Sequence, residues 1–144
     1  MSTHSSFETH HDHCIACGPS HSVQSLHLEF DWIDPLTLHS CFYVDGSYQG
    51  YDHLLHGGVA STLLDSAMTH FLLAHHVAAM TVDLNIRYHK PVVIGQVVDI
   101  YAKQDQCRHG IYWMQSGIFS HEHALVTAKA RFKVPEASRN MAHS

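Results

Sequence analysis

Three absences limit what this chain of 144 residues can be. No apolar run reaches the roughly 18 residues of a membrane-spanning helix, so we expect no membrane span. The N-terminal residues have neither the basic start nor the apolar stretch of a secretory signal, which favours a cytoplasmic location. Residues 1–86 contain no Lys or Arg, and the formal net charge of −5 argues against general binding of nucleic acid.

Charged residues make up only 15% of the chain, and they are unevenly distributed. All eight basic residues lie from Arg87 onward, where there are four acids, whereas residues 1–86 carry nine acids. A phosphate-bearing ligand would find its cations in the second half, although a solvated basic face explains the same distribution. With 45% apolar residues, the composition is that of one soluble globular domain with a sizeable core.

Cysteine is also scarce, with four residues that we expect to be reduced in a cytoplasmic protein. Cys14 and Cys17 have the spacing of a zinc knuckle, and four histidines surround them: His10, His11, His13 and His21. A structural zinc site usually needs a second, equally clear pair of ligands, and the sequence offers none. We therefore expect a turn at this position and no bound metal.

Hydrophobic periodicity divides the chain into one long helix and a series of strands. A polar leader rich in His and Ser covers residues 1–22, a single domain covers residues 23–135, and a frayed tail covers residues 136–144. The helix is expected from about Gly58 to about Val77. Strands are expected at residues 24–33, 36–44, 80–90, 95–104, 111–119 and 124–134, and the short turns between the last four predict an antiparallel meander.

The expected helix is apolar over a wide band formed by Val59, Leu63, Leu64, Ala67, Met68, Phe71 and Leu72. A helix of this kind is wrapped by a sheet rather than laid on a surface, which predicts an α+β fold. Asp65 is the one carboxylate in the helix. An ionised Asp in a core is costly unless something uses it, so Asp65 is a candidate functional residue.

Two of the expected strands alternate clearly between apolar and polar positions. In the first, Leu26, Leu28, Phe30 and Trp32 should face one way. In the strand at 80–90, one face should carry Val82, Leu84, Ile86 and Tyr88, and the other Thr81, Asp83, Asn85 and Arg87. Each pattern is typical of a half-buried strand.

Several of these residues together resemble a known family. The motifs His56-Gly57-Gly58 and Leu64-Asp65, followed by the strand Thr81–Ile86 before Lys90-Pro91, resemble the hotdog-fold acyl-CoA thioesterases. The chain is most similar to their PaaI-like branch, which includes the THEM-type proteins, and Cys14–Gly18 resembles a Cys-x-x-Cys-Gly leader of that branch. The resemblance covers about residues 14–134. It implies a hotdog fold, in which a curved antiparallel sheet of about five to six strands wraps a long central helix.

The resemblance also implies an enzyme that hydrolyses an acyl-CoA, or a related acyl thioester, to the free acid and CoA without a cofactor. Asp65 matches the catalytic acid, acting as general base or nucleophile, and the Gly57 N–H matches the donor to the thioester oxygen. His56 matches a His that orients the loop before the helix or polarises the substrate. Thr81 matches a hydroxyl that helps to hold water beside the acid, although Thr also favours a strand start.

Further substrate contacts are expected around this site. Many relatives carry Asn or Gln six residues before the His of the His-Gly-Gly motif, but that position is Gly50 here, and the amide is Gln49. The residues expected to bind substrate are Gly58, Gln49, Asn85 and Ser66. A helix N-terminus offers unpaired N–H groups and a partial positive charge, and glycine allows a close approach, so the two glycines suit an oxyanion. A plain glycine turn into a helix explains them equally well.

The spacing of the two main groups predicts an oligomer. Asp65 lies eight residues beyond Gly57, which is about 12 Å along a helix axis, whereas catalytic contact requires about 3 Å. One thioester therefore cannot touch both groups of the same helix. If both act on it, they come from two chains, so we expect a homodimer, alone or paired into a dimer of dimers.

Two other functions stay open. A protein of this fold can bind or dehydrate an acyl-CoA without hydrolysing it, although dehydratases of this fold pair His with an acid in a different pattern. A His- and Cys-rich metal-binding or stress protein would instead use Cys14, Cys17 and the neighbouring histidines as ligands.

Overall fold

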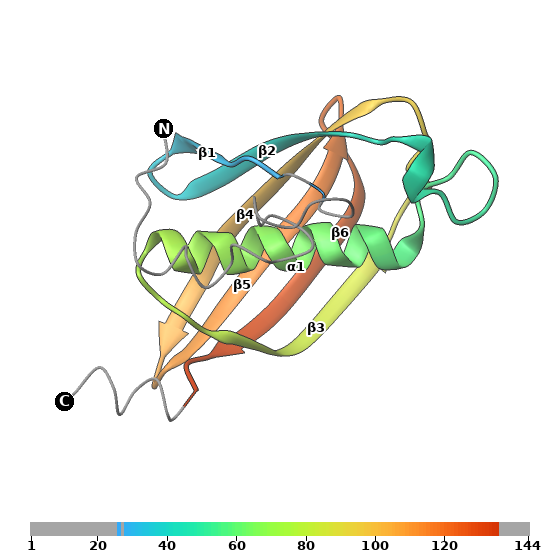
Figure 1. Cartoon of the computed structure of the whole chain (residues 1–144). Helices are drawn as coiled ribbons and strands as arrows, with labels where there is room; N and C mark the ends of the chain where they lie inside the picture. The colour runs from blue at the N-terminus through green and yellow to red at the C-terminus, as the bar shows by residue number, and fades with distance from the viewer. Residues whose placement is uncertain (1–25, 27, 136–144) are drawn as a thin grey trace.

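The structure is a computed structural model that describes Leu26 and residues 28–135. The predicted leader and tail, and with them Cys14 and Cys17, lie outside the described residues. The elements, in chain order, are β1 (Asp31–Asp34), β2 (Thr37–Tyr43), the short 3₁₀ helix η2 (Gly46–Tyr48), α1 (Gly57–Ala74), β3 (Met80–Tyr88), β4 (Val97–Arg108), β5 (Ile111–Ser120) and β6 (His123–Lys133) (Figure 1).

The six strands form one antiparallel sheet in the order β1-β2-β4-β5-β6-β3. Strands β4, β5 and β6 form the meander that the sequence predicted. The prediction was wrong for β3, which pairs with β6 and not with β4. Since β2 and β5 already occupy the two sides of β4, β3 cannot pair with β4, and it pairs with the free side of β6. This topology makes β3 an edge strand.

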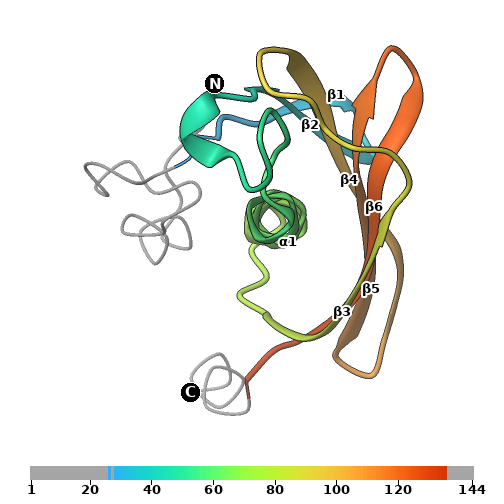
Figure 2. The same cartoon turned by 90° about the vertical axis from the view of Figure 1, so that its right-hand side faces the viewer.

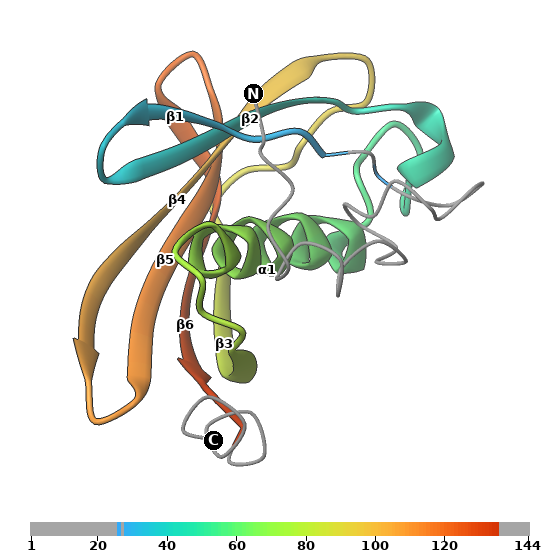
Figure 3. The ribbon, with the colours of Figure 1, turned by 60° about the vertical axis from the view of Figure 1, so that its left-hand side comes forward.

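The helix α1 lies in the concave face of the sheet, as predicted (Figure 2). Strands β1 and β2 curve over one side of the helix and β3 lies on the other side (Figure 3). The apolar side of α1 is buried against the sheet, with Leu63, Leu64, Ala67 and Met68 fully inaccessible to solvent. Burial of a large apolar side chain contributes roughly 1.5–3 kcal/mol, so this contact holds the two layers together.

The helix ends at Ala74, three residues before the predicted end. The N–H of His76 donates to the carbonyl of Leu73, and the N–H of Val77 donates to the carbonyl of Leu72. These two bonds form a Schellman cap, in which the residue after the cap adopts a left-handed conformation. His76 takes this role, with φ of 61°. Glycine is the usual residue at this position, which explains why the sequence did not reveal the helix end.

The first strand is shorter than predicted, because only its last part pairs with β2. Before it, Leu28 is buried in the core and the ring of Phe30 stacks on that of His70 at 4.7 Å. The ring of Trp32 packs edge-on against Phe71 at 5.1 Å. The predicted apolar face therefore packs as expected, but it contacts the helix largely without strand pairing.

Within the described part of the chain, no helix is both long and apolar enough to cross a membrane.

Candidate active site

The structure brings the predicted acid and hydroxyl together. Asp65 lies at the middle of α1, and its side of the helix is only partly buried. Its Oδ1 atom accepts a hydrogen bond of 2.7 Å from the hydroxyl of Thr81, at the start of β3. Thr81 is exposed, so this contact lies where solvent or a ligand can reach it. The second carboxylate oxygen of Asp65 has no hydrogen-bond partner among the described residues.

A β-bulge places Thr81 next to Asp65. The alternation of the sequence put Thr81 and Leu84 on opposite faces of the strand, and this prediction was wrong. Thr81 pairs with Phe132 and Leu84 pairs with Ala130, with one unmatched residue between Thr81 and Asp83. Phe132 and Ala130 both face the core, so Thr81 and Leu84 share the side of β3 that faces α1. The extra residue turns the Thr81 hydroxyl toward the helix.

An ion pair joins the bulged end of β3 to β6. The backbone N–H of Arg131 donates to Oδ1 of Asp83 at 3.2 Å, and its Nε donates to Oδ2 at 2.6 Å. The hydrogen bond from the Arg131 side chain is the main reason why the pKa of Asp83 is lowered. Both side chains are exposed, and exposed ion pairs contribute little to folding stability, so the pair mainly orients this end of β3.

The N-terminus of α1 is capped by His56. Its Nδ1 atom accepts a hydrogen bond of 2.8 Å from the N–H of Gly58. A Cβ atom at position 58 would lie 2.9 Å from Cε1 of His56, so the cap requires glycine there. The N–H of Gly57 precedes the helical hydrogen bonds, and it has no acceptor among the described residues. Of the two glycine N–H groups, the one at Gly57 is therefore open to a ligand.

Two further residues, which the sequence analysis did not select, fix the position of Gly57. The hydroxyls of Tyr88 and Ser61 both donate to the Gly57 carbonyl, at 2.8 and 3.1 Å. They also lie 3.0 Å from each other. Tyr88 ends β3, so these contacts tie the start of the helix to the end of the edge strand. The only signal in the sequence was that Tyr88 lies in the strand predicted at residues 80–90, on the same predicted face as Leu84 and Ile86.

The site thus has two parts at opposite ends of β3. Asp65 contacts Thr81 at the beginning of the strand, and Gly57 contacts Tyr88 at its end. Asp65 and Gly57 lie eight residues apart on one straight helix, which corresponds to about 12 Å along its axis. Within one chain, a single thioester group is too small to contact both.

Solved structures of other proteins share this architecture. A thioesterase superfamily protein has a TM-score of 0.78 at 20% identity over 84% of this chain, which spans 63% of that protein's length. Zebra fish thioesterase superfamily member 2 has a TM-score of 0.73 at 18% identity, over 88% of this chain and 94% of its own. The protein smu.793 of Streptococcus mutans, solved with acetyl CoA bound, has a TM-score of 0.69 at 16% identity, over 75% of this chain and 88% of its own. This chain has the hotdog fold.

The sequence itself supports the same relationship. A family model described as the thioesterase superfamily matches residues 53–106. This segment includes the capped helix start, Asp65 and the whole of β3. The predicted resemblance to the hotdog-fold thioesterases is confirmed, and PaaI of E. coli is among the proteins that share the fold. Among curated proteins, no sequence matches this chain.

Three of the predicted substrate-binding residues, Gln49, Ser66 and Asn85, make no hydrogen bond to the Asp65 carboxylate. The Oε1 atom of Gln49 accepts a hydrogen bond of 3.3 Å from the N–H of His53, in the loop before the helix. Ser66 is buried in the core, with 6% of its surface exposed. Asn85 lines a groove on the outer face of the sheet, opposite to the face on which Thr81 lies. Their roles stay predictions.

Several basic residues from the second half of the chain line the same groove. Besides Asn85, its lining includes Arg87, His89, Lys103 and Lys129. The predicted cations for a phosphate-bearing ligand therefore lie close together, on the face of the hotdog sheet that the helix does not cover.

Proposed function

We propose that this protein hydrolyses an acyl-CoA, or a related acyl thioester, to the free acid and CoA. The observation that carries the proposal is the Asp65 carboxylate, which Thr81 holds at the exposed edge of the sheet. This carboxylate and the Gly57 N–H, which has no acceptor within residues 28–135, both lie in the segment that matches the thioesterase superfamily. The acetyl CoA bound by the similar Streptococcus protein supports CoA thioesters as the substrate class.

In the proposed reaction, the Thr81 hydroxyl holds one oxygen of Asp65 and leaves the other for chemistry. That oxygen either removes a proton from the attacking water or attacks the thioester carbon itself. The Gly57 N–H donates to the thioester oxygen as negative charge develops on it, and the positive end of the helix dipole stabilises the same charge. The thiolate of CoA then leaves and, in the general-base route, takes up the proton held by Asp65. Where Asp65 is the nucleophile, departure of the thiolate leaves an acyl-Asp65 anhydride, and water then hydrolyses this anhydride to release the free acid and regenerate Asp65.

We further propose that each active site forms between two chains. The exposed edge strand β3 carries four large apolar residues that are exposed in the single chain: Met80, Val82, Leu84 and Tyr88. An exposed apolar edge strand readily pairs with another strand. If two copies pair antiparallel about the middle of β3, Thr81 of one copy comes opposite Tyr88 of the other. Asp65 of the first copy then approaches Gly57 of the second.

An assay of acyl-CoA hydrolysis tests the proposed activity. Wild-type protein and the Asp65→Asn variant are incubated with CoA thioesters of increasing acyl length, and the released thiol is measured. General base catalysis contributes at least about 100-fold, so we expect the variant to lose that much turnover on the preferred substrate. Asp52→Asn, which changes an exposed acid in the loop before the helix, is the matched control and should keep full turnover.

Two results would contradict the proposal. Turnover of a folded Asp65→Asn variant within threefold of the wild type would remove Asp65 from the mechanism. Binding of acyl-CoA by calorimetry, without hydrolysis of any member of the series, would favour the alternative of a non-hydrolytic acyl-CoA-binding protein.

A further inference from the structure

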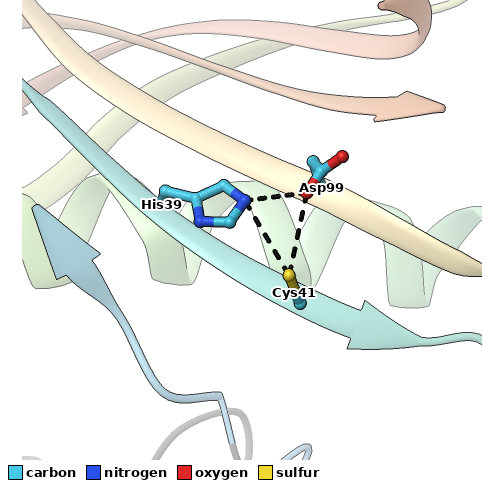
Figure 4. Close-up of side chains that lie close together, drawn as sticks. All are labelled: His39, Cys41 and Asp99. Carbon is cyan, nitrogen blue, oxygen red and sulfur yellow. Dashed lines mark hydrogen bonds and ion pairs between the residues drawn. The ribbon is translucent and has the colours of Figure 1, made fainter. Parts of the chain in front are cut away.

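Three metal-ligand side chains converge on the outer face of the sheet, away from Asp65 (Figure 4). The Nε2 atom of His39 lies 2.8 Å from Oδ1 of Asp99. The Sγ atom of Cys41 lies 3.7 Å from the same oxygen and 3.9 Å from Nε2. The three atoms therefore form a small triangle, with one nitrogen, one sulfur and one oxygen.

Strand pairing fixes this triangle. His39 and Cys41 are two residues apart on β2, so their side chains leave the same face of the strand. The intervening Ser40 points into the core. On the neighbouring strand β4, Asp99 is the direct partner of Cys41. The three side chains thus start from a rigid pair of strands, which holds ligands more reproducibly than loops do.

We propose that His39, Cys41 and Asp99 bind a divalent transition-metal ion, with zinc as the preferred ion and water as the fourth ligand. Imidazole, thiolate and carboxylate are all zinc ligands, and three protein ligands leave one position open. Bonds of about 2.0–2.3 Å place the ligand atoms of tetrahedral zinc roughly 3.3–3.6 Å apart. The two distances from Sγ of Cys41 are close to this range. The distance from Nε2 of His39 to Oδ1 of Asp99 has to lengthen by about 0.5 Å when the ion replaces the hydrogen bond between these atoms.

The charges in the cluster favour a cation over a catalytic thiol. A Cys-His-Asp relay uses the two different nitrogens of its His, whereas Nε2 of His39 faces both Cys41 and Asp99. A divalent ion would balance the thiolate and the carboxylate together.

The surroundings of His39 support a built site. The ring of Tyr101 packs against the His39 ring with centroids 4.9 Å apart, and Phe119 packs against Tyr101 in turn at 5.6 Å. Such outer contacts restrict the orientation of a ligand ring. The cluster is half open to solvent, since 19% of the His39 side chain and 40% of the Asp99 side chain are exposed, so an ion can enter.

Zinc and cobalt titrations of the full-length chain test the site. Cys14 and Cys17 are replaced by Ser in all samples, because their spacing could hold a metal ion independently. We expect one equivalent of zinc per chain, and a thiolate-to-metal charge-transfer absorption when Co²⁺ replaces zinc. Loss of an outer contact already weakens metal binding about 10–100-fold, so Cys41→Ser should weaken it at least about 100-fold. Cys107, on β4, is the other free cysteine among the described residues, and Cys107→Ser should have no effect.

A second measurement covers variants that fold poorly. In the parent protein, saturating zinc should slow alkylation of Cys41 by iodoacetamide, measured by mass spectrometry, while alkylation of Cys107 stays unchanged. Asp99→Asn should abolish this protection. No stoichiometric zinc, equal zinc binding by Cys41→Ser and Cys107→Ser, or equal alkylation of Cys41 with and without zinc would overturn the proposal. Acyl-CoA hydrolysis does not enter any of these readouts, so the proposed function and the metal site fail separately.

Discussion

The hydroxyl of Thr81 reaches the carboxylate of Asp65 because β3 contains a bulge immediately after Thr81. Without the extra residue, a regular strand would turn Thr81 to the outer face of the sheet, together with Asp83. The bulge therefore converts an ordinary polar strand position into a partner for the one carboxylate of the helix. Bulges are frequent next to active sites because they redirect single side chains in this way.

Replacement of Thr81 tests this contact. Thr81→Val keeps the shape of the side chain but removes the donor to Asp65. A hydrogen bond to a charged group contributes roughly 1.5–3 kcal/mol, so we expect kcat to fall at least about tenfold with KM within a few-fold. Thr81→Ser keeps the hydroxyl and should restore most of kcat. Equal kcat in the Val variant and the wild type, or equal losses in Val and Ser, would show that Thr81 does not position Asp65.

The His56 cap leads to a prediction about stability. His56→Ala removes the acceptor for the Gly58 N–H, so the free energy of unfolding should fall by about 0.5–2 kcal/mol, measured by urea denaturation. Asn is a preferred capping residue, and His56→Asn should therefore keep both the stability and the turnover. If the Asn variant is as stable as the wild type but has lost its activity, His56 polarises the substrate and does not act through the cap alone.

The elements that the sequence predicted well are those whose pattern is local. The apolar band of the helix follows directly from the helical period, and the strand segments and short turns of β4, β5 and β6 are likewise local features of the sequence. The His-Gly-Gly motif was similarly informative, because a helix start, its cap and its glycines are neighbours in sequence. These patterns also identified Asp65, since a carboxylate in an apolar helix stands out from its surroundings.

Other features depend on partners that are distant in sequence. The position of β3 at the sheet edge follows from the other strands occupying both sides of β4. The contact between Tyr88 and Gly57 joins residues 31 positions apart, and the cluster of Cys41 with Asp99 joins residues 58 positions apart. None of these contacts leaves a periodic signal in the sequence.

The exposed edge of β3 gives a prediction about oligomeric state. Val82 is 53% exposed on this edge, and a Lys on an edge strand opposes pairing with another strand. Val82→Lys should therefore convert dimers to monomers in analytical ultracentrifugation and lower the turnover at least about tenfold, because each site would lose the second chain. Leu36→Lys, at a 74% exposed position in the turn between β1 and β2, is the control and should remain dimeric and active. A monomeric wild type, or a fully active Val82→Lys monomer, would contradict the two-chain site.

Two inactive variants can show directly whether the site is shared. Asp65→Asn removes the carboxylate, and Gly57→Pro removes the N–H donor. Proline is well tolerated at the first position of a helix, and the backbone of His56, with φ of −61° and ψ of 132°, already has the extended conformation required before proline. Gly57→Pro should therefore fold and dimerise, which circular dichroism and gel filtration verify. Gly57→Ala keeps the N–H, and its Cβ would lie in ordinary contact at 3.4 Å from the Tyr88 hydroxyl, so it should retain activity.

When the Asn and Pro variants are unfolded, mixed in equal amounts and refolded together, random pairing makes about half of the dimers heterodimers. In a shared-site dimer, each heterodimer has one site that carries both substitutions and one site that carries neither. The mixture should therefore recover about a quarter of the wild-type activity, whereas each variant refolded alone should stay inactive. If each site lay within one chain, every site of the heterodimer would carry one substitution, and no activity would return. Heterodimers that form, as detected by mass spectrometry, but show no activity above that of the two parents would exclude the shared site.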